Sequence, residues 1–292
     1  MNLLKGTSAV ITGSGRGIGR AYAKAMAREG AQIVVNDIDA DEAERVVTEI
    51  KTDGGEAVAN GDNIADWRGA GRLISQCVGA FGKIDVLINN AAIHHATPIW
   101  EETEAQYDET LHVVLKGTFN PSRHALSHMV PKKSGCIINV TSGAQAGLLG
   151  QSVYGAAKAG VASFTYTWAL ELAPYNIRVN AISPLAATRL GAAMQAKVPS
   201  YVEKGYPPEN LGPLAVFLAS DDARYITGQV IRLDGNILSL FSHPKPVHPV
   251  IQPNGWTVDD LRKYFKETIG KNLEPVGLRA ARYEYYDGLG AE

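Results

Sequence analysis

Short apolar runs rich in valine and isoleucine alternate along the chain with longer amphipathic stretches. Seven of these runs have the length and the β-branched composition that strands favour. The predicted strands are Ala9–Thr12, Gln32–Asn36, Glu56–Asn60, Ile84–Ile88, Cys136–Val140, Ile177–Ala181 and Gln229–Leu233. Because the runs are apolar on both faces and joined by segments long enough for crossover helices, they indicate one seven-stranded parallel sheet with helices on both sides. The pattern therefore predicts a doubly wound α/β fold.

The alternation stops near residue 235, which separates a main domain, residues 1–238, from a C-terminal extension, residues 239–292. The extension carries several prolines and one convincing helix, expected near residues 257–269 with Thr257 as its N-cap. Apolar side chains follow this helix at helical spacing, so the stripe needs a surface to cover. We expect the extension to pack on its own domain, to cover a pocket or to lie at a subunit interface.

Composition narrows the class of protein. With 292 residues, 45% of them apolar, the chain can bury the core of one large α/β domain. A formal charge of −2 without a basic run argues against nucleic acid, and no apolar run approaches the roughly 20 residues that cross a bilayer. The N-terminus enters a strand without a secretory signal pattern. Cys77 and Cys136 lack metal or redox spacing and are expected as buried free thiols, which favours a cytoplasmic protein.

A glycine-rich stretch, residues 12–19, lies directly between the first predicted strand and a helix that begins near Arg16. Glycines let such a turn adopt unusual dihedral angles and bring the backbone close to a pyrophosphate, which the helix N-terminus attracts. This placement predicts a Rossmann-type dinucleotide site. Its candidate cofactor-binding residues are Gly13, Ser14, Arg16, Gly17, Ile18 and Gly19.

Asp37 closes the second predicted strand, 18 residues after Gly19. A carboxylate at this position can accept a hydrogen bond from the free ribose 2′-hydroxyl of NAD. The 2′-phosphate of NADP would meet like charge there, so Asp37 favours NAD, with Ile38 beside it. Arg16 in the glycine loop could still meet a phosphate, which keeps NADP open as the less favoured cofactor.

Two further pairs follow the third and fourth strands. Asp62 and Asn63 could hydrogen-bond an adenine, although a solvated turn is an equally ordinary use of Asp-Asn. Asn90 and Ala91 could line the other side of the cofactor, and the alternative is an Asx turn that ends the strand. All four are candidate cofactor-binding residues.

Tyr154 and Lys158 are one helical turn apart in the stretch Ser-Val-Tyr-Gly-Ala-Ala-Lys. A free tyrosine has a pKa near 10, and a close cation favours the phenolate. The spacing thus points to a phenol that can act as an acid or base near neutral pH.

These motifs together resemble the short-chain dehydrogenase/reductase family over residues 3 to 235: the glycine loop, Asn-Asn-Ala, a serine ahead of Tyr-x-x-x-Lys, and Asn-Ala-Ile-Ser-Pro184. The resemblance implies that Tyr154 is the general acid/base. It also implies that Lys158 binds the nicotinamide ribose and lowers the tyrosine pKa, and that Ser142 hydrogen-bonds the substrate oxygen. Pro184 to Thr188 would lie beside the nicotinamide, with Thr188 on its carboxamide. Three short stretches, Arg20–Ala23, Val35–Asp37 and Ala57–Asn60, are similar to sequences of the hydroxyacyl and hydroxysteroid dehydrogenase branch.

The chain departs from the family pattern at Val114 and in the interval from Ser142 to Tyr154. Val114 replaces an asparagine that kinks a helix and anchors a water linking the lysine to solvent, which puts the proton relay in doubt. His112 could substitute, but two helical residues point about 200° apart, so we expect it at the surface or in the core. The interval from Ser142 to Tyr154 is one residue shorter than is common, which leaves Thr141 as a second candidate donor behind Ser142.

Loops expected around the nicotinamide are mostly apolar and predict a bulky substrate, alicyclic, steroid-like or acyl. The candidate substrate-pocket residues are His94, His95, Gln145, Leu149, Gln151 and Leu185. Adjacent histidines without a carboxylate at ligand spacing do not predict a metal site.

The sequence therefore predicts an oxidoreductase that transfers a hydride between NAD(H) and a small-molecule secondary alcohol or ketone, with Ser142, Tyr154 and Lys158 as its catalytic residues. The alternative is an NAD-binding sensor or scaffold with weak or no catalysis, motivated by Val114 and the long extension. The resemblance also implies a homodimer or homotetramer, and the composition argues against nucleic-acid and membrane partners.

Overall fold

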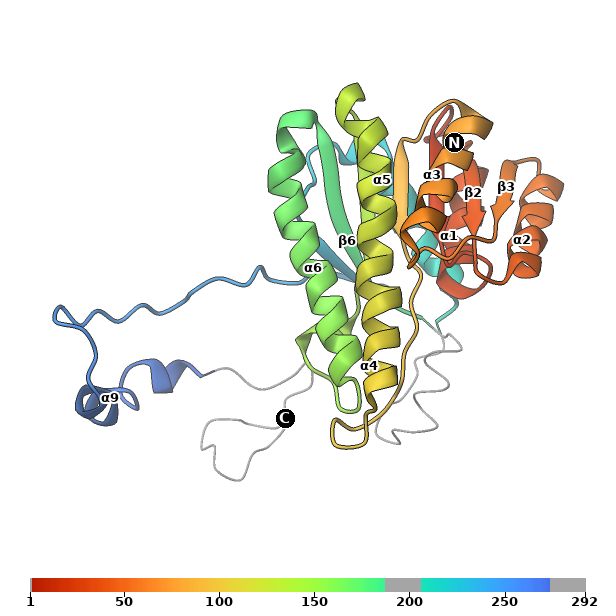
Figure 1. Cartoon of the computed structure of the whole chain (residues 1–292). Helices are drawn as coiled ribbons and strands as arrows, with labels where there is room; N and C mark the ends of the chain where they lie inside the picture. Colours follow the sequence, from red (N-terminus) through yellow and green to blue (C-terminus); the bar gives the residue numbers. More distant parts are fainter. Residues whose placement is uncertain (1, 187–205, 274–292) are drawn as a thin grey trace.

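The computed structural model describes residues 2–186 and 206–273, and they form an α/β domain with a central twisted sheet (Figure 1). The strand order is β3-β2-β1-β4-β5-β6-β7-β8, and every pair from β3 to β7 is parallel. The strands are β1 (Ser8–Thr12), β2 (Gln32–Asn36), β3 (Glu56–Asn60), β4 (Val86–Asn89), β5 (Gly135–Val140), β6 (Ile177–Leu185), β7 (Val230–Asp234) and β8 (Ile237–Leu240). The prediction of a doubly wound sheet is confirmed.

Helices cover both faces of this sheet. The main helices are α1 (Gly17–Arg28), α2 (Ala40–Thr52), α3 (Trp67–Phe81), α4 (Glu104–Thr110), α5 (Gly117–Lys132), α6 (Ser152–Leu172), α8 (Gly212–Ala219) and α9 (Val258–Tyr264). A π-helical segment, η1 (Leu111–Lys116), joins α4 to α5. The short 3-10 segments are η2 (Gly143–Ala146), η3 (Ala173–Tyr175), η4 (Pro208–Leu211), η5 (Asp221–Ala223) and η6 (Ile269–Asn272).

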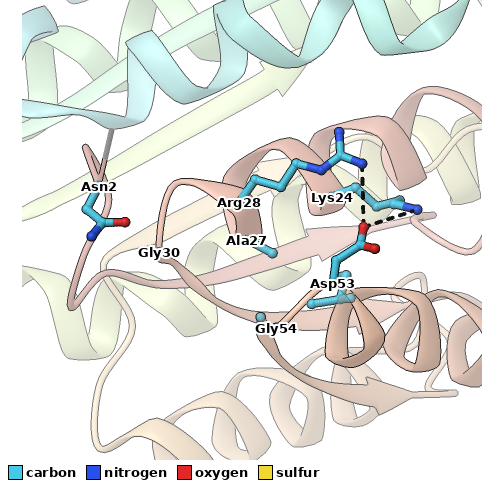
Figure 2. A pocket seen from close by; sticks show the side chains of 9 residues that line it. Asn2, Lys24, Ala27, Arg28, Gly30, Asp53 and Gly54 are labelled. Atoms are coloured by element: carbon cyan, nitrogen blue, oxygen red, sulfur yellow. Dashed lines mark hydrogen bonds and ion pairs between the residues drawn. The ribbon is translucent and has the colours of Figure 1, made fainter.

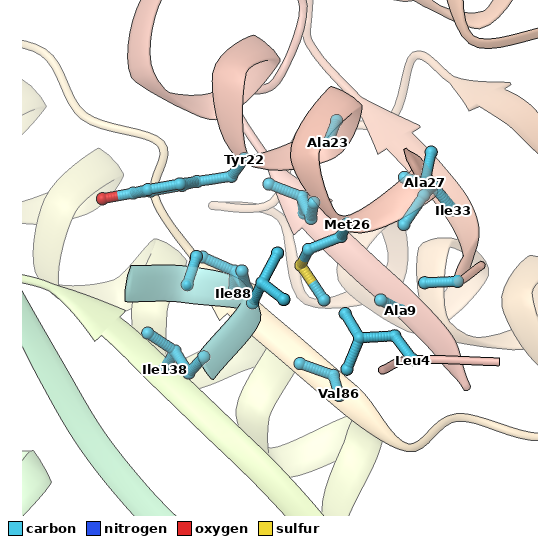
Figure 3. Packing of buried hydrophobic residues seen from close by; sticks show 14 of the residues in the cluster. Leu4, Ala9, Tyr22, Ala23, Met26, Ala27, Ile33, Val86, Ile88 and Ile138 are labelled. Carbon is cyan, nitrogen blue, oxygen red and sulfur yellow. The ribbon is translucent and has the colours of Figure 1, made fainter. Parts of the chain in front are cut away.

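Side chains that alternate along the strands pack into two separate hydrophobic cores, one on each face of the sheet. Ile11 and Ile88 face helices α1, α2 and α8, where Tyr22 and Met26 are completely buried (Figure 3). Their neighbours Val10 and Leu87 face the opposite way, toward α3, α5 and α6. Because side chains alternate along a strand, a sheet covered on both sides needs strands that are apolar throughout. This double burial explains the continuous apolar runs of the sequence.

The eighth strand is a correction to the predicted count. Gly235, with φ of +61°, and Asn236 form a two-residue turn, after which β8 runs antiparallel to β7 from Asp234↔Ile237 onward. Tight turns of this kind join antiparallel strands. The predicted boundary between residues 238 and 239 therefore falls inside a strand.

The C-terminal segment leaves the sheet edge after β8 and extends away from the domain, so that α9 stands apart from it in Figure 1. Thr257 is the N-cap of α9 as predicted, and Asp260 completes a capping box. The helix ends at Tyr264, earlier than expected, and the Thr268 hydroxyl donates to the Tyr264 carbonyl oxygen at 2.8 Å. A threonine hydroxyl that binds a carbonyl one turn back competes with regular helix extension.

Candidate active site

The glycine loop turns at the carboxyl end of β1, where the strands on either side, β2 and β4, diverge into helices on opposite faces. In open α/β sheets ligands bind at such a switch point. Gly13 has φ of +61°, a left-handed conformation that disfavours side chains. A Cβ on Gly19 would lie 2.3 Å from the Gly13 carbonyl oxygen, so α1 begins tight against the loop. The backbone cradle fits a pyrophosphate at the N-terminus of α1.

Asp37 lies at the end of β2 beside this loop. Its Oδ2 accepts the Gly15 N–H at 3.0 Å and its Oδ1 accepts the Asp39 N–H at 3.1 Å. The carboxylate is thereby aimed at the turn where a ribose 2′-hydroxyl would be presented. Ile38 is exposed on the same edge.

Arg16 is engaged by two carboxylates. Its guanidinium lies 2.6 Å from Asp39 and 3.1 Å from Glu42. The ion pair with Arg16 holds the pKa of Asp39 below its usual range. A guanidinium that is already paired on two sides offers less to a 2′-phosphate than a solvent-facing one.

Asp62 and Asn63 form a turn, which was the alternative to an adenine contact in the sequence prediction. Asp62 is paired with Arg72 and accepts the Asn60 side-chain amide at 3.0 Å. Asn63 accepts the Ala65 N–H at 2.9 Å, an Asx turn that leads into α3. These bonds account for both residues without a ligand, and a contact with adenine stays a prediction.

Asn90 braces the glycine loop, a role that its sequence position did not reveal. Its amide donates to the carbonyl oxygens of Thr12 and Gly13, both at 2.9 Å. The backbone N–H groups of Asn90 and Ala91 donate to the Thr12 hydroxyl at 3.0 and 3.1 Å. The end of β4 thus fixes the loop after β1, across 78 residues of sequence.

Tyr154 and Lys158 lie one turn apart on α6, in the arrangement their spacing predicts. The Lys158 Nζ is 5.6 Å from the centroid of the Tyr154 ring and donates to the Val140 carbonyl oxygen at 2.6 Å. Lys158 is only 2% exposed, and burial lowers its pKa to about 7. In its protonated form a lysine this close favours the ionised form of a phenol.

Ser142 and Thr141 follow β5 at the same edge, and their hydroxyls have different partners. The Thr141 hydroxyl donates to the Ile182 carbonyl oxygen at 3.3 Å and is completely buried between strands. The Ser142 Oγ accepts the Ala144 N–H at 3.2 Å, which leaves its proton available to donate. This difference favours Ser142 as the donor to a substrate oxygen.

Gly155, adjacent to Tyr154, sets the approach of α6 to this edge. A Cβ on Gly155 would lie 2.7 Å from the Ala144 carbonyl oxygen, so only glycine lets the helix contact η2. Sequence reasoning missed this residue, although a glycine beside the proposed tyrosine was a usable signal.

Val114 is buried against Ala157 and Val161, with Tyr154 packed at the edge of the same cluster. The helix around it is nevertheless irregular, because Leu111–Lys116 is π-helical. The Thr118 hydroxyl donates to the Val114 carbonyl oxygen at 2.7 Å. His112 is exposed, as expected.

All the predicted pocket residues except Leu185 come from two loops that meet. Thr97 pairs with Gln151, which is buried and immediately precedes α6. His94 lies edge-on to Tyr154 with 4.7 Å between ring centroids, and the His95 Nε2 is 2.9 Å from the Glu109 carboxylate. These contacts bring the loop after β4 to the start of α6.

The other predicted pocket positions differ in exposure. Leu149 is 79% exposed, whereas the Gln145 Oε1 is buried without a hydrogen-bond partner among the described residues. Pro184 and Leu185 end β6 at the same sheet edge. Thr188 lies outside the described residues.

A hollow of about 170 Å³ lies at the amino ends of the strands, at the other end of the sheet from the glycine loop. Gly30 and Gly55, which precede β2 and β3, line it (Figure 2). Lys24 and Arg28 border it, and both are paired with Asp53 at 3.7 and 3.4 Å. Both of these cations are therefore already paired with a carboxylate of the protein.

Three further observations bear on the class of protein. Cys77 and Cys136 are buried and free, as predicted, and burial raises the pKa of Cys77 to about 12. Within residues 2–186 and 206–273, no three histidine, cysteine or acidic side chains gather as a metal site would require. No helix in these same ranges has the length and apolarity to span a membrane.

Comparisons with known proteins agree with this geometry. The sequence model of the family described as short chain dehydrogenase matches residues 7–198. The chain is 36% identical over 241 residues to the (2S)-[(R)-hydroxy(phenyl)methyl]succinyl-CoA dehydrogenase subunit BbsD of Thauera aromatica, covering 80% of this chain and 97% of that protein. It is 35% identical to the 3-oxoacyl-[acyl-carrier-protein] reductase FabG of Thermotoga maritima, covering 80% and 99%.

A crystal structure of a short chain dehydrogenase from Mycobacterium avium superimposes with a TM-score of 0.84 at 38% identity. That match covers 96% of this chain and 100% of the other. At this identity and coverage the likeness extends beyond the fold to the family. The chain belongs to the short-chain dehydrogenase/reductase family of oxidoreductases.

Proposed function

We propose that the protein transfers a hydride between NAD(H) and a secondary alcohol or ketone, with Tyr154 as the general acid/base. The observation that carries the proposal is the buried Lys158 Nζ, 5.6 Å from the Tyr154 ring, on a helix that opens at the cofactor edge of the sheet. Few structural roles require a lysine ammonium beside a phenol in the protein interior.

Each residue of the set has a stated task. When bound, the nicotinamide supplies the group that gives or takes the hydride. Tyr154 donates its proton to the ketone oxygen in reduction, and its phenolate accepts the hydroxyl proton in oxidation. Ser142 donates a second hydrogen bond to the same oxygen, where negative charge develops. Lys158 favours the phenolate and would hold the nicotinamide ribose.

Substitution of the phenol tests the chemistry. Tyr154→Phe should lower kcat at least about a thousandfold while the NAD dissociation constant stays within about twofold, because the ring remains and only the transferable proton is lost. The substrate screen follows NADH absorbance over alicyclic, steroid and acyl alcohols. A near-native rate in Tyr154→Phe would show that the assigned acid/base is wrong.

The preference for NAD over NADP rests on Asp37 and on the pairing of Arg16. A 2′-phosphate would approach the Asp37 carboxylate, while Arg16 is held by Asp39 and Glu42 at 2.6 and 3.1 Å. Titration of the protein with each cofactor measures the ratio of the two dissociation constants.

A bulky apolar substrate is supported by the side chains near the Thr97–Gln151 pairing. Ile99, Trp100 and Leu149, each two or three residues along the chain from that pairing, are 62%, 81% and 79% exposed, and a large apolar substrate could cover them. The names of the two relatives above denote acyl thioesters that carry a hydroxyl or keto group. An acyl substrate of this kind therefore joins alicyclic and steroid-like alcohols in the screen.

The alternative, an NAD-binding sensor or scaffold with weak catalysis, remains motivated by Val114. Its side chain cannot hold the water of the usual relay, and its carbonyl oxygen already accepts the Thr118 hydroxyl. Any turnover that Tyr154→Phe abolishes would exclude the sensor.

We further propose a cytoplasmic homodimer or homotetramer in which the C-terminal extension lies at a subunit interface. Leu170 on α6 is 79% exposed, and α9 presents Val258, Leu261 and Tyr264 to solvent while standing apart from its own domain (Figure 1). Exposed apolar stripes of this kind usually meet a partner.

Truncation after His243 tests the interface. It removes α9 but keeps β8 and the ring contact of His243 with Tyr166. The expected result is a lower molecular mass by light scattering with unchanged NAD binding. An unchanged mass together with altered substrate affinity would place the extension over the pocket instead.

A further inference from the structure

We propose that His94 is a positioning residue that holds the Tyr154 ring in its reactive orientation; the inference rests on the proposed role of Tyr154. The two ring centroids are 4.7 Å apart and the ring planes meet at 66°. In such an edge-to-face contact the positive edge of one ring meets the negative face of the other, so one mutual orientation is preferred.

His94 adds a contact to the Tyr154 ring that neither its own helix nor η1 provides. Lys158 lies one turn along α6, with its Nζ 5.6 Å from the ring centroid, and Val114 belongs to the apolar cluster on which the phenol packs. His94 approaches from a different element, the loop after β4. Contacts from α6, η1 and this loop together limit ring rotation more than contacts from α6 and η1 alone.

The loop that carries His94 is itself anchored on both sides of the residue. Before His94, the Ala91 N–H donates to the Thr12 hydroxyl at 3.1 Å. After it, the His95 Nε2 lies 2.9 Å from the Glu109 carboxylate on α4 and Thr97 pairs with Gln151, the residue before α6. A backbone tied at these points fixes the path of the loop between them. The His94 ring is therefore presented to Tyr154 from a braced segment.

Orientation matters here because hydride and proton must move in one geometry. Small displacements of a reacting group can lower rates by large factors even when binding is intact. Loss of the His94 ring should therefore lower kcat and leave KM for NAD nearly unchanged.

The experiment compares His94→Ala, which removes the ring, with His94→Phe, which keeps a ring and removes the imidazole. We expect kcat to fall about five- to tenfold in His94→Ala and to recover to within about twofold of wild type in His94→Phe. A positioning role leaves the pH profile of kcat in place. The matched control is His243→Ala. His243 also packs against a tyrosine, Tyr166, with 4.6 Å between ring centroids, but this pair lies outside the site.

Three results would overturn the proposal: a loss in His94→Ala no larger than in His243→Ala, a phenylalanine variant no better than the alanine one, or a displaced pH profile. A displaced profile would mean that the imidazole takes part in proton transfer. If wild-type protein shows no turnover that depends on Tyr154, the proposed function fails instead. A crystal structure of His94→Ala then tests the inference alone, and an unmoved Tyr154 ring would refute it.

Discussion

The glycine loop forms the cofactor side of the site, and two loops, residues 92–103 and 141–151, lie next to Tyr154; the latter are called here the loops above Tyr154. The two regions differ in how many of their polar groups already have hydrogen-bond partners. At the glycine loop, Asn90 donates to two backbone carbonyl oxygens and the Thr12 hydroxyl receives two backbone N–H groups. Above Tyr154, the Gln145 Oε1 is buried without a partner in the described part of the chain, and Leu149 is largely exposed.

This difference separates a preformed surface from one that a ligand completes. Internal hydrogen bonds fix the shape of the glycine loop before any cofactor arrives, which lowers the entropy cost of binding. The loops above Tyr154 leave one polar acceptor and several apolar side chains for a substrate to satisfy. Changes on the cofactor side should therefore affect folding and binding together, whereas changes in the loops should affect substrate kinetics alone.

The largest effect is expected from Gly19→Ala. Its Cβ would lie 2.3 Å from the Gly13 carbonyl oxygen and 2.5 Å from the Asn90 Nδ2, so the loop and its brace cannot both persist. We expect NAD affinity to fall at least about a hundredfold and the free energy of unfolding to fall by about 2 kcal/mol or more, measured by calorimetry.

The control for this change is Gly79→Ala on α3, where an added Cβ meets nothing within 4 Å. That substitution should raise the free energy of unfolding by about 0.5–1 kcal/mol, because alanine favours the helix. Native NAD affinity in Gly19→Ala would contradict a rigid, preformed cradle.

Lys158→Met should abolish turnover yet raise the melting temperature of the cofactor-free protein. The folded pKa of Lys158 is about 7, against 10.5 for an unperturbed lysine, because burial disfavours the charge. Between these values the unfolded chain binds a proton that the folded one lacks, so wild-type stability rises with pH across this window. Methionine removes that dependence, so its advantage should be larger at about pH 6 than at about pH 9.

Thermal melts at both pH values check the prediction, with the exposed Lys51→Met as the control. A gain in melting temperature that did not shrink as pH rises would mean that burial of the Lys158 charge is not the cause.

Asp37→Ala should raise the ratio of the NAD to the NADP dissociation constant about tenfold. The variant lacks the carboxylate that accepts a hydrogen bond from the 2′-hydroxyl of NAD and repels the 2′-phosphate of NADP. NAD affinity should weaken further because Asp37 also accepts the Gly15 N–H of the glycine loop at 3.0 Å. Calorimetric titration gives the ratio, and Asp41→Ala at the start of α2 is the control. An unchanged ratio would remove Asp37 as the discriminating residue.

The smallest effect is expected from Leu149→Ser. It should raise KM for apolar substrates about three- to tenfold through lost apolar contact, with unchanged melting temperature and NAD affinity. Leu3→Ser at the N-terminus is the control, since Leu3 is also exposed and lies outside these loops. Equal KM values in the two variants would show that Leu149 does not contact substrate.

The sheet and the glycine loop could be predicted because their signals are local. Apolar runs mark strands buried on both faces, and Gly13 and Gly19 follow the first strand at fixed intervals. The eighth strand was missed, although Asp-Gly-Asn followed by an apolar run is a hairpin signal. The brace from Asn90 to Gly13 spans 77 residues and has no local signature.

Sequence also identified Tyr154, Lys158 and Ser142 as candidates but left Thr141 open. The choice between Thr141 and Ser142 depends on which hydroxyl a neighbouring strand already uses, and the Ile182 carbonyl oxygen takes that of Thr141. The contact of His94 with Tyr154 was likewise invisible, because the two residues share only tertiary proximity.

The sequence by itself determined the alternation of strands and helices, the phosphate loop and the phenol–ammonium pair, since each depends on residue type at short spacing. Only the tertiary structure decided which polar groups are already bonded, how deeply Lys158 is buried, and that His94 packs on Tyr154. Those properties arise where segments distant in the chain meet, and there burial and partner geometry set the energy of every polar group.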